Sequence, residues 1–173
     1  MRLPVHFDGN EWFSTLSLLA MMAIIWILPR RFPTIVSIVF LVIGSGTALF
    51  VDFHFGLPPV DMYDVNDLSY YEWFDLLNFF LYSPFAYVFL YLFDWWKPKG
   101  IRISLYVLAW SIVGLAYEWV SVTYFHLYNY RKGWQFGYSF VFYFASQSFT
   151  VWFYYLVKQC YNRTKNRTGP EWA

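Results

Sequence analysis

Five stretches of the chain contain almost no Asp, Glu, Lys or Arg, and short polar segments separate them. They cover residues 12–28, 34–51, 71–93, 103–125 and 134–157. Each comes close to the ~20 residues with which an α-helix crosses a bilayer core of ~30 Å. The pattern therefore predicts an all-α, polytopic integral membrane protein, with five transmembrane helices in one antiparallel bundle over residues 1–157. Residues 158–173 are predicted to form a basic tail.

Composition narrows the class of protein further. Only 13% of the 173 residues are charged and 27% are aromatic, which is far from the usage of soluble domains. The net charge of +1 creates no overall field, so we expect no nucleic-acid partner. Cys160 is the single cysteine, which excludes an intrachain disulfide and a cysteine-based zinc cluster.

The distribution of Lys and Arg predicts an orientation in the bilayer. One side holds nine of them, namely Arg30, Arg31, Lys97, Lys99, Arg102, Lys158, Arg163, Lys165 and Arg167. The opposite side holds only Arg2, Arg131 and Lys132. Because cytoplasmic loops carry the excess of basic residues, we expect the N-terminus outside and the C-terminus, with its basic tail, in the cytoplasm of a cell-membrane protein.

Glu118 is the only formally charged residue between Arg102 and Arg131, in the middle of an apolar stretch. An acid in hydrocarbon costs at least ~2.5 kcal/mol, so such a residue usually has a partner or a function. One interpretation is a structural hydrogen bond that holds neighbouring helices in register. The other is a proton or cation site, and the sequence leaves both open.

Polar residues of the third, fourth and fifth spans fall at similar depths. With a helix rise of ~1.5 Å per residue, Glu118 lies ~8 Å below the outer surface, at the level of Asn78 in a hairpin of consecutive spans. Polar faces of neighbouring helices turn toward each other because lipid offers no hydrogen bonds. We therefore predict a polar seam between these spans, with an ion site near its outer end. Its candidate residues are Glu72, Asp75, Asn78, Glu118, His126 and Gln147.

The chemistry of this seam stays open. Carboxylates with an imidazole suit a divalent metal, but acids at the start of the third span also favour the helix dipole. The chain has no catalytic zinc, nucleotide-binding or hydrolase motif, so we expect no catalytic residue and no cofactor. In the second span, Gly44, Ser45, Gly46 and Ala48 offer a small-residue face for close helix packing.

Short aromatic motifs carry a family resemblance. They are Pro33-Thr34, Tyr71-Glu72-Trp73-Phe74, Tyr117-Glu118-Trp119, Tyr130 followed by Gly133-Trp134, and Ser139. From the second to the fifth span, the chain resembles a family of small, uncharacterised multi-spanning membrane proteins from endospore-forming Gram-positive bacteria. The resemblance implies a five-span bundle in a bacterial cytoplasmic membrane, and it implies no activity, substrate or cofactor.

Three functions are compatible with these features. The first, favoured by the lack of a catalytic motif, is a structural or accessory component of the lipid bilayer that assembles with itself or with a membrane-protein partner. The second is a small transporter or ion- or proton-binding protein that uses the outward-facing carboxylates. The third is a membrane enzyme with an acidic outer site. The polar seam thins below Tyr82 and Ser111, which favours an outward-opening pocket over a channel.

Overall fold

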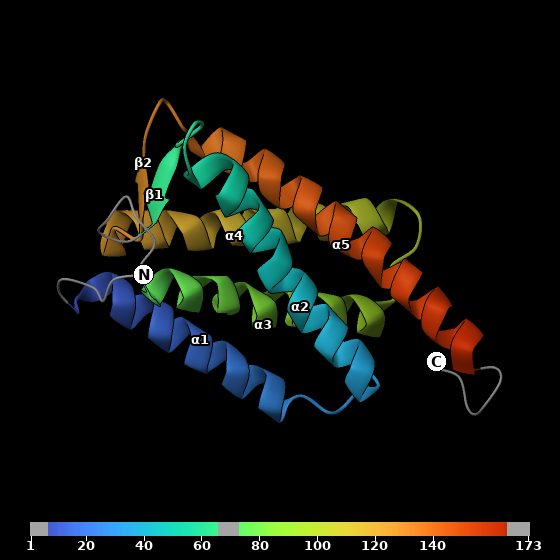
Figure 1. Cartoon of the computed structure of the whole chain (residues 1–173). Helices are drawn as coiled ribbons and strands as arrows, with labels where there is room; N and C mark the ends of the chain where they lie inside the picture. The colour runs from blue at the N-terminus through green and yellow to red at the C-terminus, as the bar shows by residue number, and fades with distance from the viewer. Residues whose placement is uncertain (1–6, 66–72, 166–173) are drawn as a thin grey trace.

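The computed structural model describes residues 7–65 and 73–165, and Figure 1 shows long helices throughout this part of the chain. The helices are α1 (Gly9–Ile27), α2 (Thr34–Val51), α3 (Trp73–Trp96), α4 (Ile101–Phe125) and α5 (Phe136–Lys165). A π-helical turn, η1 (Asp52–Gly56), extends α2, and two short strands, β1 (Tyr63–Val65) and β2 (Tyr128–Tyr130), pair antiparallel. Five helices are long and apolar enough to cross a membrane, and the chain is a multi-span membrane protein.

The helices differ from the predicted spans mainly at their ends. α1 begins at Gly9, before residue 12, because Asp8 and Glu11 form a capping box: the Glu11 carboxylate accepts the Asp8 N–H at 2.9 Å. Such a box satisfies backbone donors that the first turn leaves open. α5 continues to Lys165, so the first residues of the predicted basic tail are helical. Residues 158–165 contain neither Pro nor Gly, so no helix-breaking residue interrupts this part of α5.

Figure 1 shows that the helices do not pack simply in chain order. α3 packs closely against both α1 and α2, while α4 pairs with α5. The consecutive helices α3 and α4, expected to form a close hairpin, meet chiefly through large aromatic side chains. Examples are Phe89 against Tyr106, with ring centroids 5.1 Å apart, and Phe85 against Tyr117, at 5.2 Å. Bulky rings hold the two backbones apart, and this separation leaves space inside the bundle.

The α2–α3 contact depends on small residues, as the sequence suggested for part of α2. A Cβ atom at Gly44 would lie 2.6 Å from the Tyr82 carbonyl oxygen and 2.8 Å from the Ser83 Cα. The hydroxyls of Ser45 and Ser83 are hydrogen-bonded across the same contact. Gly46 points away from it, since a Cβ there would meet nothing within 4 Å.

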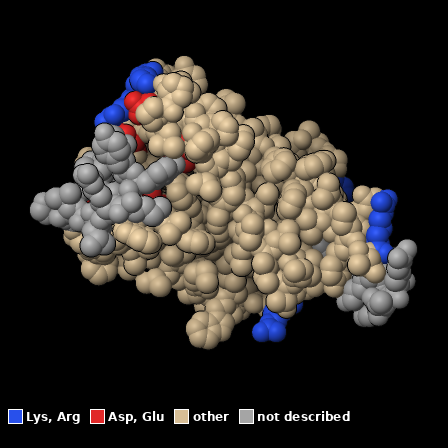
Figure 2. Space-filling view, in the orientation of Figure 1, with Lys and Arg blue, Asp and Glu red and all other residues tan. Residues whose placement is uncertain are grey.

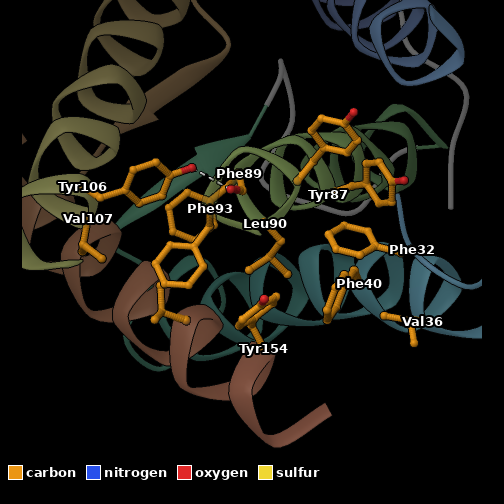
Figure 3. Packing of buried hydrophobic residues seen from close by; sticks show 12 residues of the cluster. Phe32, Val36, Phe40, Tyr87, Phe89, Leu90, Phe93, Tyr106, Val107 and Tyr154 are labelled. Atoms are coloured by element: carbon orange, nitrogen blue, oxygen red, sulfur yellow. Dashed lines mark hydrogen bonds between the residues drawn. The ribbon is translucent and has the colours of Figure 1, made fainter. Parts of the chain in front are cut away.

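An aromatic and aliphatic core fills the half of the bundle that contains the α1–α2 and α3–α4 turns, here named the tail end. Figure 3 shows this core, in which side chains from α2, α3, α4 and α5 meet. Phe40 and Leu90 have no exposed surface, and Phe93 is 2% exposed. The opposite half, which carries β1 and β2, is named the strand end.

Charged side chains lie toward the two ends of the molecule. On the face shown in Figure 2, Lys and Arg lie toward both ends, Asp and Glu are visible at one end only, and an uncharged surface lies between the ends. Large apolar side chains such as Trp26, Val42, Val141 and Trp152 are exposed on the helices. An apolar girdle between charged ends is the surface that a bilayer covers.

Candidate functional site

A cavity of about 230 Å³ lies in the strand-end half, between the separated helices α3 and α4. α2, α3, α4 and α5 form its walls, and residues of β1 and β2 also line it. Most of the lining is aromatic or aliphatic. The polar exceptions include Asp52, Asn78, Glu118, Ser139 and Gln147.

Glu118 is 5% exposed and lies on the wall of this cavity. Its Oε1 accepts hydrogen bonds from the Tyr130 hydroxyl and, at 2.6 Å, from Ser139 Oγ. Tyr143 of α5 lines the same cavity. Trp134 Nε1 in turn donates to Ser139 Oγ at 3.0 Å. The carboxylate therefore joins α4 to α5 and to β2.

The environment of Tyr130 keeps its hydroxyl protonated. Burial raises the pKa of this hydroxyl above its ordinary value, and the hydrogen bond to the Glu118 carboxylate, with the negative charge of that group, raises the pKa further. A phenol with a raised pKa stays a hydrogen-bond donor at neutral pH. Tyr130 is thus a permanent donor to Glu118.

The structure brings three of the sequence-predicted site residues, Asn78, Glu118 and Gln147, to the cavity wall. Their partners differ from the expected ones. Gln147 Oε1 accepts the hydroxyl of Ser111 at 3.0 Å. Glu118 is bonded instead to hydroxyls of β2 and of the first turns of α5. Counting residues along each helix gives only the depth of a polar group. This estimate is too coarse to decide which of two groups about two helical turns apart is the hydrogen-bond partner of Glu118.

Two of the other three predicted residues, Asp75 and His126, do not line the cavity. Asp75 is buried in the first turn of α3 but is not part of the cavity lining. His126 is exposed and ends α4 in a left-handed conformation. Glu72 lies outside the described residues. Within residues 7–65 and 73–165, no group of three His, Cys, Asp or Glu side chains could hold a metal ion, so the metal hypothesis gains no support there.

The predicted site residues did not include several aromatic and acidic groups that line the cavity. Asp52, in η1, lines it, as do Tyr82 and Tyr128, whose hydroxyls are hydrogen-bonded at 2.5 Å. Tyr63 of β1 pairs with Tyr130 of β2. Strands of three residues leave no detectable alternation in a sequence, so the pattern of apolar positions did not predict them.

Two ion pairs connect the segment around β1 to the residues that follow β2. Arg131 Nε lies 2.5 Å from Asp64 Oδ2, and Lys132 Nζ lies 3.4 Å from Asp61 Oδ2. The Arg131 N–H also donates to the Met62 carbonyl at 2.7 Å. These contacts hold the α2–α3 and α4–α5 connections together at the strand end of the cavity.

Another buried acid, Asp94, lies at the tail end and was not among the predicted site residues. Its side chain is fully buried and accepts hydrogen bonds from Arg31 Nε and the Tyr154 hydroxyl. Lys158 Nζ lies 3.6 Å from its Oδ1. Arg31 Nη2 also donates to the Asp94 carbonyl at 3.0 Å. Asp94 thus links the α1–α2 turn, α3 and α5.

Comparisons with known proteins add no homologue to these observations. No family model matches the chain, and neither a curated protein nor a solved structure matches it. The resemblance of its aromatic motifs to a family from endospore-forming bacteria is therefore a prediction that these comparisons leave open. The chain's own residues indicate a multi-span membrane protein, and a cavity lies at its strand end.

Proposed function

We propose that this protein is a structural or accessory component of a membrane and that Glu118 holds its helices in register. The observation that carries this proposal is the set of groups bound to Glu118. They are neutral hydroxyls from β2 and α5. A carboxylate that accepts several hydrogen bonds from separate elements fixes their relative positions.

The packing of the tail end also favours a protein that does not conduct ions. Phe89 belongs both to the cavity lining and to the apolar core. Beyond it, Phe40, Leu90 and Phe93 are buried with almost no exposed surface. A transported ion would need polar groups along its whole path, and this core offers aromatic and aliphatic side chains instead.

The proposed setting follows from charge and from the family resemblance. We propose a bacterial cytoplasmic membrane, with the strand end outside and the tail end in the cytoplasm. The strand end carries Arg131 and Lys132, whereas basic residues are far more numerous at the tail end. The protein would act by assembling with itself or with a membrane-protein partner.

The test combines stability and flux measurements on the purified full chain. Glu118→Leu leaves the half-buried Tyr130 hydroxyl and the buried Ser139 hydroxyl without their acceptor, so we expect the free energy of unfolding in detergent to fall by about 2–4 kcal/mol. Glu118→Gln retains an acceptor oxygen and serves as the matched control, with a smaller loss of unfolding free energy.

Proteoliposomes with the unaltered protein should show no proton or potassium flux above protein-free vesicles.

The cavity itself favours a second candidate, an outward-facing carrier. Its space lies at the strand end, with a carboxylate on its wall. The decisive result would be ion flux through the unaltered protein that Glu118→Gln abolishes without changing the melting temperature. That result would establish the carrier and contradict the accessory role.

A further inference from the structure

We propose that the cavity at the strand end binds a small organic cation of the methylated ammonium class. This proposal concerns the cavity alone and goes beyond the accessory role, because a membrane component without transport can still bind a ligand. It rests on the charge of the cavity wall, on its aromatic composition and on its size.

The charge of the wall has one sign. Asp52 and Glu118 line the cavity, and its described lining contains no Lys, Arg or His. The groups that donate hydrogen bonds to Glu118 are hydroxyls, which carry no positive charge. Away from bulk water, the attraction between a carboxylate and a cation is several times stronger than in solution. The cavity therefore favours a cation and disfavours an anion.

The walls favour an organic cation over a metal ion. Twelve of the 28 lining residues are Phe, Tyr or Trp. Aromatic faces attract cations by about 2 kcal/mol when water is excluded, and methylated ammonium groups are their typical ligands. Metal ions such as Ca²⁺ and Mg²⁺ instead require several oxygen ligands at fixed distances. No group of His, Cys, Asp or Glu in the described residues is arranged to hold one.

The aromatic groups and the carboxylate occupy the same part of the cavity. Trp134 donates to Ser139, which donates to Glu118. The Trp134 ring stacks on Phe142, with centroids 5.5 Å apart, and contacts Tyr63 at 5.4 Å. A ligand near Glu118 would therefore lie next to several rings of α5, β1 and the connection between β2 and α5.

The size of the cavity limits the ligand to a compact molecule. An apolar cavity of ~150 Å³ in another protein admits benzene. The volume of about 230 Å³ here therefore accommodates a trimethylammonium group with a short substituent. Long or branched ligands would require displacement of the rings.

The experiment compares two probes of matched shape on the purified full chain in detergent. One is choline. The other is the neutral alcohol in which a tert-butyl group replaces its trimethylammonium group. Affinity is measured by calorimetric titration and by the rise in melting temperature. We expect saturable choline binding at least about tenfold tighter than binding of the alcohol, because only choline carries the charge.

Variants then locate the site. In Glu118→Gln, choline affinity should fall at least about tenfold, and affinity for the alcohol should stay within about twofold. Phe142→Leu should weaken choline binding as a second variant if Glu118→Gln does not fold. Asp61→Asn, which alters an acid that does not line the cavity, is the matched control and should bind choline normally. Equal affinities for the two probes, absence of saturable choline binding, or unchanged affinity in Glu118→Gln would overturn the proposal.

Discussion

Glu118 and Asp94 are two buried acids that the chain satisfies in different ways. Asp94 lies near the tail end, where Arg31 and Lys158 reach its carboxylate. Hydroxyls of α5 and β2 donate to Glu118, and the described residues that line the cavity beside it include no Lys or Arg. Asp94 therefore has basic partners, whereas hydroxyls are hydrogen-bonded to Glu118 beside the cavity.

Asp94→Asn should lower the free energy of unfolding by about 2–4 kcal/mol, because it removes the shared partner of Arg31, Tyr154 and Lys158 from a buried site. Thermal unfolding in detergent, followed by tryptophan fluorescence, measures the loss. Asp61→Asn is the control. Its pair with Lys132 is partly exposed and should contribute less than about 1 kcal/mol. Equal losses in the two variants would show that Asp94 has no special structural role.

At the scale of elements, the α2–α3 contact shows how small residues decide helix packing in a membrane. Lipid tails are as apolar as Leu, so helices associate through close van der Waals contact and hydrogen bonds. Gly44 permits the close van der Waals contact, and the Ser45–Ser83 hydrogen bond also joins the two helices. The opposite situation holds between α3 and α4, where large rings keep the backbones apart.

Two glycines of the same helix provide a matched test of this contact. Gly44→Ala should destabilise the protein by about 1–3 kcal/mol, because the new methyl group would overlap the backbone of α3. Gly46→Ala should be neutral or stabilising by up to ~1 kcal/mol, since Ala is the better helix former and space is open there. Melting temperatures in the same detergent compare the two. A larger loss for Gly46→Ala would contradict the observed helix face.

At the scale of the whole molecule, the bundle has two different halves. The tail end is closed by the core around Phe40, Leu90 and Phe93. The strand end contains the cavity and carries the two-stranded sheet. The proposed orientation places the cavity toward the outside of the cell, where a ligand would reach it without crossing the membrane.

The single cysteine offers a direct test of that orientation. Cys160 is exposed near the end of α5, so a membrane-impermeant maleimide should label it only after cells are permeabilised. Asn129→Cys, in a Cys160→Ser background, places the thiol on β2, where residue 129 is exposed. It should react in intact cells. The reverse labelling pattern would show that the strand end faces the cytoplasm.

The number and approximate ends of the helices were predictable because each depends on local sequence. An apolar run of about twenty residues forms a helix in a bilayer whatever its neighbours are. The small-residue contact at Gly44 was predictable for the same reason, since a glycine beside small residues marks one helix face. The two strands were not, because they form only where residues 63–65 meet residues 128–130.

The sequence by itself determined a multi-span helical membrane protein and drew attention to Glu118, since both follow from the free energy of placing side chains in hydrocarbon. Only the tertiary structure decided which groups bind Glu118, that α4 pairs with α5, and that a cavity lies beneath β1 and β2. These features depend on how bulky rings and small residues from distant segments fit together. Packing of that kind is a property of the assembled bundle and leaves no periodic signal in any one helix.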